Sequence, residues 1–292
     1  MTSYSINDLE KLSGIKAHTI RIWEKIYSLL NPKRTETNIR YYDDADLRKV
    51  LNIALLNRNG IRISQIACLS ESEVIEKINS LSELNRDDEN IIDNLVISMI
   101  DLNERKFERI LNNAIMQKGF EDTIMNTIYP LLEKIGILWQ TGSINPAQEH
   151  FVSNLIRQKL IVAIDGLSEE SNNRLYRFVL FLPEGEMHEI GLLFYHYLIK
   201  KRGHKVIYLG QSVPYEDLKR VVDIKSCDYF LTSFSSNITG IDIMKYLEKL
   251  SKSFPDQIIL FSSFDKEIYR KKLPDNLVNI RNALEFNNLL DN

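Results

Sequence analysis

The chain has 292 residues, of which 44% are hydrophobic and 26% charged, and its formal net charge is −3. This length allows two or three domains with separate cores, and the composition is that of an ordinary globular protein. Cys68 and Cys227 are its only cysteines, which excludes a disulfide framework. Residues 1–5 lack the basic and apolar stretches of a signal peptide, and no apolar run reaches membrane-spanning length. We therefore expect a cytoplasmic protein with no membrane partner.

Charge is unevenly distributed along the chain. Residues 1–70 contain eleven Lys and Arg against seven Asp and Glu, a net charge of +4, so residues 71–292 sum to −7. A basic segment joined to an acidic body indicates that one end of the chain meets a polyanion. A solvated surface without such a partner has the same composition, so charge alone leaves both interpretations open.

Residues 1–75 show the pattern of short helices separated by turns. Apolar residues at helical spacing end at Ser13-Gly14, and a second helix is predicted over 17–26. Asp43 or Asp44 is the predicted cap of a third helix. A helix, a glycine turn and a second helix form the helix-turn-helix pattern, whose second helix enters the major groove of DNA. A helical hairpin with a solvated basic loop has the same spacing, and spacing does not separate the two.

Three stretches in this region resemble the MerR-type winged-helix regulators: Ile15–Glu24, Leu30–Arg34 and Asn38–Tyr42. The resemblance covers about residues 4–70 and implies binding to an inverted repeat in a double-stranded DNA operator. It also implies that Trp23 and Leu30 belong to the core. The residues expected at the DNA, on the second helix and on the wing that follows it, are His18, Thr19, Arg21, Arg34, Arg40, Tyr41 and Tyr42.

The remaining chain divides into a linker and two domains. The polar stretch 76–89 predicts a linker, and helical periodicity over 90–170, broken near Asn103, near Gly119 and at residues 142–146, indicates a four-helix bundle. Over 174–292, short apolar runs alternate with helical patterns. This alternation is typical of a parallel sheet covered on both faces, a doubly wound α/β domain. The expected fold class is therefore a multidomain α and α/β protein.

Candidate ligand-binding residues occur in both of these domains. Glu149 lies ten positions after Trp139 and precedes His150, so the three side chains can converge across a Gly/Pro break. A buried Trp, a capping Glu and a surface His have the same spacing. His188 follows the first predicted strand of the α/β domain, at the edge where doubly wound sheets bind ligands. One of its ring nitrogens is a possible metal ligand while Glu186 orients the ring through the other; a structural His is the alternative.

The sequence Glu186-x-His188-x-x-Gly191 resembles the loop of cobalamin-binding modules whose His is the lower ligand of cobalt. Ser233 matches a Ser that these modules carry on the third strand. Their next strand ends in a Gly-Gly pair, where the backbone approaches the nucleotide tail of the cofactor, and here Ser262-Ser263 takes that place. Because Ser adds a side chain and restricts the backbone, we expect altered or weakened binding of the tail. Hydrogen bonds from the two hydroxyls to the tail are the alternative.

Trp139, Glu149 and His150 match the Trp-x9-Glu-His motif of light-sensing, cobalamin-dependent MerR-type regulators of the CarH type. The four-helix segment resembles the cap over the upper face of the cofactor. The resemblance implies that Trp139 and Glu149 hold the 5′-deoxyadenosyl group of adenosylcobalamin, although another cobalamin is possible. It also implies that His150 becomes an upper cobalt ligand after light has broken the Co–C bond.

The resemblance as a whole implies a DNA-binding transcription regulator rather than an enzyme. We expect a repressor that is gated by adenosylcobalamin and responds to light through a change of homo-oligomer, a dimer or a tetramer. One alternative is a regulator of the same build that binds another corrinoid or a protein partner without sensing light. A more distant alternative is the corrinoid carrier of a methyltransferase or a mutase, which would have no use for a winged helix.

Overall fold

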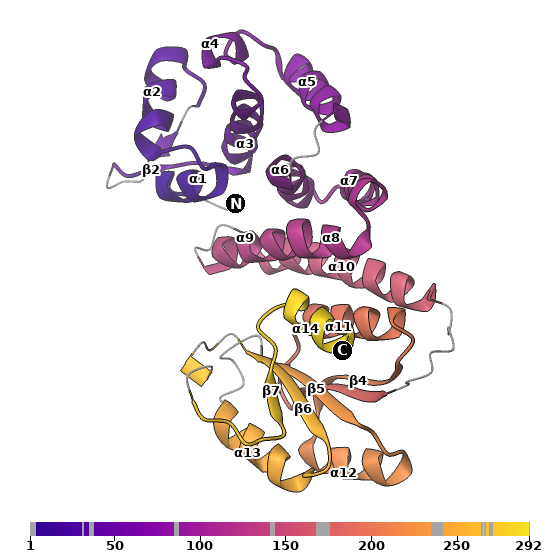
Figure 1. Cartoon of the computed structure of the whole chain (residues 1–292). Coiled ribbons are helices and arrows are strands. Elements are labelled where there is room, and N and C mark those ends of the chain that lie inside the picture. The colour runs from indigo at the N-terminus through magenta and orange to yellow at the C-terminus, as the bar shows by residue number, and fades with distance from the viewer. Residues whose placement is uncertain are drawn as a thin grey trace. The chain divides into compact units, whose positions relative to one another are not determined.

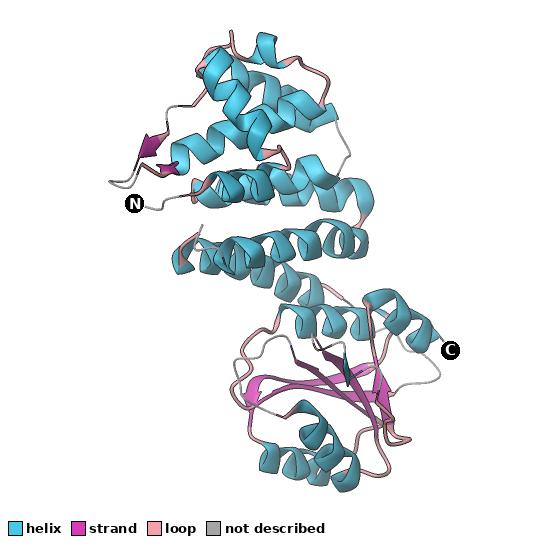
Figure 2. Cartoon of the chain, turned by 90° about the vertical axis from the view of Figure 1, so that its left-hand side faces the viewer, coloured by secondary structure: helices cyan, strands magenta, loops and turns pink. Residues whose placement is uncertain are grey.

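The computed structural model describes residues 4–30, 32–34, 38–84, 88–140, 144–167, 176–234, 242–263, 265, 267–268 and 271–291. The chain divides into two compact units, Met1–Leu155 and Ile156–Asn292 (Figures 1 and 2). None of the helices in the described part of the chain has the length and apolar character needed to cross a membrane.

The first unit begins with the winged helix-turn-helix. Its elements are α1 (Ile6–Ser13), α2 (Ala17–Tyr27), the antiparallel strands β1 (Lys33–Arg34) and β2 (Arg40–Tyr41), α3 (Asp44–Arg58), α4 (Ile63–Ile66) and α5 (Glu71–Leu84) (Figure 1). Asp43 caps α3 by accepting hydrogen bonds from the backbone of Ala45 and Asp46. Gly14 ends α1 with φ of 72°, a left-handed conformation that glycine adopts without strain, so the chain can turn directly into α2.

The core of this domain is built from apolar side chains of α2, α3, α4 and α5. Trp23 and Leu30, expected in the core, are 6% and 4% exposed, so that prediction is confirmed. Trp23 belongs to a cluster with Leu29, Ile53, Leu55, Leu56, Ile66 and Ile78. Burial of these side chains stabilises the arrangement that presents α2 and the β1–β2 wing.

Helices α6 (Asp88–Ile100), α7 (Glu104–Lys118), α8 (Phe120–Thr123), α9 (Tyr129–Gln140) and α10 (Pro146–Asp165) follow, with a π-helical turn over Ile124–Ile128 between α8 and α9. The expected breaks near Asn103 and Gly119 are confirmed, since Asn103 caps α7 and Gly119 ends it. In the third expected break, residues 141–143 lie outside the described residues.

The stretch 76–89 differs from the predicted linker, because α5 continues to Leu84 and α6 begins at Asp88. The polar composition of this stretch favoured a linker, although Val74, Ile75, Ile78 and Leu81 recur at helical spacing across its start.

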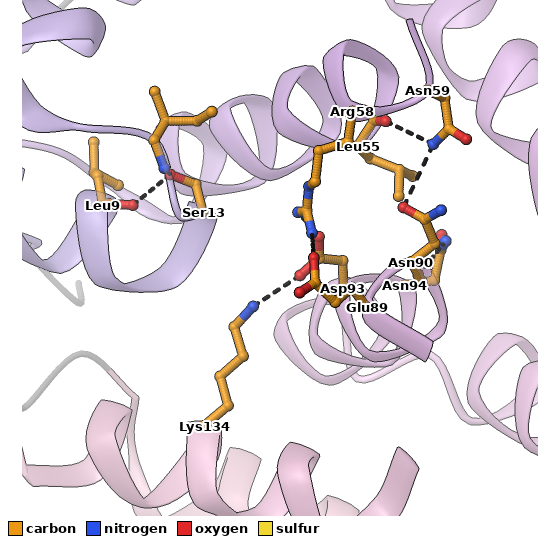
Figure 3. A network of polar contacts seen from close by, with 11 residues as sticks. Leu9, Ser13, Leu55, Arg58, Asn59, Glu89, Asn90, Asp93, Asn94 and Lys134 are labelled. Carbon is orange, nitrogen blue, oxygen red and sulfur yellow. Dashed lines mark hydrogen bonds and ion pairs between the residues drawn. The ribbon is translucent and has the colours of Figure 1, made fainter. Parts of the chain in front are cut away.

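A buried carboxylate joins the winged helix-turn-helix to the helices that follow it (Figure 3). The side chain of Asp93, on α6, is 1% exposed and forms ion pairs with Arg58 at the end of α3 and with Lys134 on α9. The distance from Lys134 Nζ to Asp93 Oδ1 is 2.8 Å. Arg58 also pairs with Glu89 at 3.1 Å, but Glu89 is 72% exposed. Asp93 is thus the point at which α3, α6 and α9 meet through charged groups.

The second unit is a five-stranded parallel sheet in the order β4-β3-β5-β6-β7. Its elements are β3 (Arg177–Pro183), α11 (Ile190–Lys201), β4 (Lys205–Val213), α12 (Tyr215–Ile224), β5 (Tyr229–Phe234), α13 (Ile243–Ser253), β6 (Ile258–Ser263), β7 (Leu277–Asn279) and α14 (Ala283–Asp291). Helices α11 and α14 cover one face, and α12 and α13 cover the other (Figures 1 and 2). This is the doubly wound α/β arrangement that the alternating pattern predicted.

The strand order places a switch point beside β3. From β3 the chain passes through α11 to β4 on one side, and then through α12 to β5 on the other side of β3. Connections that leave neighbouring strands toward opposite faces open a crevice at the carboxyl edge, and ligands of doubly wound domains bind there. The loop 184–189, which contains His188, follows β3 at this edge.

Candidate functional site

The loop after β3 holds one imidazole in a defined orientation. The carboxylate of Glu186 is 2% exposed, and its Oε1 accepts hydrogen bonds from the backbone of Met187 and His188, both at 3.0 Å. The same oxygen lies 2.6 Å from Nδ1 of His188, whose side chain is 57% exposed. A carboxylate at Nδ1 favours the tautomer that carries the proton there and presents the lone pair of Nε2 to a metal. Glu186 therefore orients His188 in the way proposed from the sequence.

The backbone of this loop is fastened to the end of β4. The backbone N–H of Gly185 donates to the Ser212 hydroxyl at 3.0 Å, and Gln211 donates from its side chain to the carbonyl of Met187 at 2.6 Å. Gly191, in the first turn of α11, has open space where a side chain would begin, since a β-carbon there meets no heavy atom within 4 Å. The loop is thus held from one side while the backbone at Gly191 stays open to a close approach.

A second buried carboxylate stands directly beside His188, and the sequence analysis missed it. Glu189 is 6% exposed and accepts hydrogen bonds from Arg157 Nε at 2.5 Å and from the hydroxyl of Tyr208 at 2.8 Å. Burial, followed by the nearness of Glu189, raises the pKa of Tyr208. Glu189 thereby ties the His188 loop to α10 and to β4. The one signal in the sequence was a carboxylate just before an apolar helix, which is usually a solvated first-turn residue.

Three serines gather at the carboxyl ends of β5 and β6. Ser233 and Ser262 are paired in register, and the hydroxyl of Ser262 donates to that of Ser233 at 2.9 Å. The hydroxyl of Ser263 accepts a hydrogen bond from the backbone of Asp265 at 3.1 Å. The hydroxyls of Ser262 and Ser263 are therefore already used within the protein, at the edge of the sheet that also carries the His188 loop.

Trp139, Glu149 and His150 lie in the first unit, at the end of α9 and in the first turns of α10. Trp139 is 49% exposed, so the interpretation of this residue as a buried core tryptophan is wrong. Glu149 Oε2 lies 2.7 Å from Nδ1 of His150, and the hydroxyl of Ser153 donates to Glu149 Oε1 at 2.5 Å. The exposed indole of Trp139 offers an apolar surface to a ligand, and the paired carboxylate and imidazole offer polar groups.

The residues expected at DNA fall on two elements. His18, Thr19 and Arg21 lie in the first half of α2, with His18 and Arg21 exposed and Thr19 half-buried. On the wing, Arg34 is an exposed residue of β1 whose guanidinium donates to the side-chain oxygen of Asn38 at 2.6 Å. An exposed helix N-terminus beside an exposed basic wing is the arrangement by which winged helices meet a groove and its flanking phosphates.

The second strand of the wing divides into two kinds of residue. Arg40 and Tyr41 are half-buried, and Arg40 Nε lies 3.7 Å from a carboxylate oxygen of Glu24 on α2. Tyr42, expected at the DNA, is fully buried, and its hydroxyl donates to Glu24 at 2.5 Å. Its backbone also pairs with that of Tyr4. Tyr42 therefore anchors the wing to the core, which corrects its placement at the DNA.

A bare metal ion would find too few ligands around these residues. In the described ranges, no group of three or more His, Cys, Asp and Glu side chains is close enough to hold one. A cobalt ion that a corrin ring already holds through four nitrogens needs a single side chain on each face, so one oriented imidazole is sufficient. The geometry at His188 thus fits a corrinoid better than a free metal.

Comparison with known proteins identifies two segments of the chain. The family described as MerR HTH family regulatory protein matches residues 4–73, and the family described as B12 binding domain matches residues 91–163. The chain is 27% identical to the HTH-type transcriptional repressor CarH of Myxococcus xanthus over 264 residues, 87% of this chain and 86% of that protein. The chain therefore carries a MerR-type helix-turn-helix domain and a B12 binding domain, the composition of a transcription regulator. This regulator is also 29% identical to the repressor CarA of the same organism over 211 residues, 72% of this chain and 68% of CarA.

The match to the B12 binding domain coincides with α6 to α10 of the regulator. Over 70% of its length, the chain shares the fold of a solved monomethylamine corrinoid protein of Methanosarcina barkeri, 98% of which is covered. The TM-score is 0.56 and the sequence identity 16%. Both relatives are transcriptional repressors, which agrees with the expectation of a regulator rather than an enzyme. The MerR-type domain identifies the regulator as a DNA-binding protein and separates it from a corrinoid carrier.

Proposed function

We propose that this regulator is a repressor that binds its operator while adenosylcobalamin is bound and releases it in light. The observation that carries the proposal is the His188 loop, where a buried carboxylate fixes a half-exposed imidazole at the switch point of a doubly wound domain. Such a carboxylate–histidine pair is the usual arrangement behind a metal-binding imidazole. The likeness to CarH and CarA over most of the chain supports repression as the outcome.

His188 would hold cobalt through Nε2 on the lower face of the corrin, with Glu186 fixing its ring through Nδ1. The open space beside Gly191 suits close approach of the ring or its tail. Ser233 would contact the tail, and Ser262 and Ser263 would stand where it passes. Because the hydroxyl of Ser262 already donates to Ser233, tail binding costs the exchange of that hydrogen bond.

Trp139 and Glu149 would contact the adenosyl group on the upper face. The indole of Trp139 is exposed on the described surface, which is costly for a large apolar ring unless a ligand covers it. Bound adenosylcobalamin supplies a cobalt–carbon bond that light breaks. His150 would then become the second protein ligand of cobalt through Nε2, with Glu149, 2.7 Å from its Nδ1, orienting the ring. The binding of His150 to cobalt is the local change on the chain that we propose light controls.

His18, Thr19 and Arg21 of α2 would contact the major groove, and Arg34, Arg40 and Tyr41 of the wing would contact the flanking backbone. A homo-oligomer, a dimer or a tetramer, would place two such domains on the two halves of an inverted repeat. Two linked half-sites bind far more tightly than one, because the second contact forms at a high effective concentration. A cofactor that favours the oligomer thermodynamically therefore controls operator binding.

The test is to add adenosylcobalamin to the purified chain in the dark and record its absorbance, mass and operator gel shift before and after illumination. We expect a coloured complex in the dark, a spectral change in light, a smaller assembly and weaker DNA binding. His188→Ala should lose the lower ligand and its spectrum, whereas Met187→Ala, at an exposed neighbour in the same loop, should keep them. A chain that stays colourless with every cobalamin would refute the cofactor, and a gel shift that is equal in light and dark would refute the light switch.

A second candidate function is a regulator of the same build that binds another corrinoid without sensing light. The Ser262-Ser263 pair favours it, since it stands where a Gly pair would admit the nucleotide tail and the hydroxyl of Ser262 already donates to Ser233. A corrinoid that lacks the tail should then bind at least as tightly as adenosylcobalamin. Dark spectra of the chain with cobinamide and with adenosylcobalamin distinguish the two functions.

A further inference from the structure

A cavity of about 640 Å³ lies inside the first unit, apart from the residues assigned to cobalamin. Its walls come from α3 and α5 of the MerR-type domain and from α6, α7 and the turn between them. Its volume falls within the range of small-molecule sites, roughly 300–1,000 Å³. The cavity therefore has the size of a ligand site and is bordered by both the DNA-binding domain and the B12-binding domain.

The walls of this cavity are strongly basic. Arg48 of α3 and Arg105, Lys106 and Arg109 of α7 line it, against the carboxylates of Asp101 and Glu71. Arg48 pairs with Asp101 at 2.9 Å. Among the residues that the structure describes, no carboxylate forms an ion pair with Arg105, Lys106 or Arg109. The wall that α7 contributes thus carries three cations without a direct ionic partner in the described part of the chain.

This arrangement of charge is unfavourable in the protein alone. Arg105 and Arg109 are separated by one helical turn, and like charges at this spacing destabilise a helix. Burial lowers the pKa of Lys106; the carboxylate of Asp101 opposes this effect, and the nearby Arg109 and Arg48 add to it. An anion in the cavity would offset both the repulsion between the two arginines and the burial of the Lys106 ammonium.

We propose that this cavity binds a small phosphate-bearing anion, such as the diphosphate or triphosphate group of a nucleotide. Arginine side chains recognise phosphate oxygens through paired N–H groups, and Lys106 adds a point charge at the same wall. The cavity is partly open to solvent, so a small molecule can enter it, and its volume suits a nucleotide-sized ligand. Because the anion would contact Arg48 on α3 and three cations on α7, it would act at the junction between the DNA-binding and B12-binding domains. Cobalamin has no part in the inference.

The experiment is a calorimetric titration of the full-length regulator, without cobalamin, with inorganic pyrophosphate and with ATP at fixed ionic strength. We expect saturable binding, and a rise in the melting temperature that sodium chloride of matched ionic strength does not produce. Lys106→Gln combined with Arg109→Gln should weaken binding by about tenfold or more. Lys49→Gln, on the exposed side of α3 next to Arg48 but outside the cavity, should leave binding unchanged. Arg109→Lys keeps the charge and should lose less than the double variant.

Three results would overturn the proposal. Heats that do not saturate with either probe would show that there is no anion site, and equal binding by the double variant and by Lys49→Gln would place the site elsewhere. If the double variant loses affinity for a duplex of random sequence while its pyrophosphate binding is unchanged, the cations contact DNA instead. Circular dichroism of each variant controls for folding, and the single variants Lys106→Gln and Arg109→Lys replace the double variant if it does not fold.

Discussion

Replacing Asp93 by Asn removes one charge from the point where α3, α6 and α9 meet. The carboxylate is 1% exposed, whereas Arg58 and Lys134, its two cationic partners, are 31% and 21% exposed. Breaking a buried ion pair by removing one partner costs about 3–5 kcal/mol. Both cations can turn partly toward water, and Arg58 keeps Glu89 as a partner, so we expect a loss at or just below the lower end of this range, about 2–3 kcal/mol.

Glu89→Gln is the matched control, because Glu89 pairs with the same arginine at 3.1 Å but is 72% exposed. Exposed ion pairs contribute about 0–1 kcal/mol, so this replacement should hardly change the free energy of unfolding. The difference between the two variants therefore measures what burial adds to the same kind of contact.

Tryptophan fluorescence during urea unfolding is a suitable assay. Trp23 and Trp139 are the two tryptophans of the chain, and both lie in the same unit as Asp93. Trp23 is 6% exposed and should report the loss of the winged-helix core. Equal urea midpoints for Asp93→Asn and Glu89→Gln would refute the argument from burial. Two separate fluorescence transitions in Asp93→Asn would show that the carboxylate also couples the unfolding of the winged helix to that of the helices α6 to α10.

Three further predictions concern a buried histidine, the DNA-binding wing and the serine pair at the carboxyl edge of the sheet. Burial lowers the pKa of His196 to about 4. Between pH 6.5 and 4 the unfolded chain therefore binds a proton that the folded chain does not. The free energy of unfolding should fall by up to about 3 kcal/mol as the pH drops through this window. His196→Phe, which keeps a ring stacked on Tyr208, should lose this dependence in calorimetric scans, and an unchanged pH profile would contradict the assignment. Arg34→Ala should weaken binding to all operators alike and lower the salt slope of the binding constant by about one, whereas a loss restricted to one base position would mean that Arg34 reads sequence. Ser262→Gly with Ser263→Gly should tighten cobalamin binding about fivefold by spectroscopic titration, and weaker binding would mean that the hydroxyls hold the tail.

Local signals in the sequence were sufficient for most elements of the fold. Caps and turn residues such as Asp43 and Gly14 act within one or two helical turns, so the helices they bound could be predicted directly. The apolar runs of β3 to β6 are long because both faces of the sheet are covered, which predicted a parallel sheet. The position of His188 then followed from the rule that ligands bind at the carboxyl edge of such a sheet.

Two short or weakly patterned elements were not predicted. Strand β7 has three residues, too few to show a period, and α14 lies at the end of the chain beside α11. The second half of α5 was assigned to a linker because of its polar composition, although Val74, Ile75, Ile78 and Leu81 recur at helical spacing. Packing against a neighbouring element, rather than local pattern, specifies β7 and α14.

The sequence by itself determined the order of the domains, the winged helix and the loop that carries His188, because each depends on residues a few positions apart. Tertiary structure alone decided that Tyr42 turns into the core, and that Asp93 meets Arg58 and Lys134, which lie 35 and 41 positions away along the chain. It also decided that the cations of α7 face a cavity. Such contacts are set by how helices pack on one another, and the periodicity of a helix specifies which face is buried but not which partner it meets.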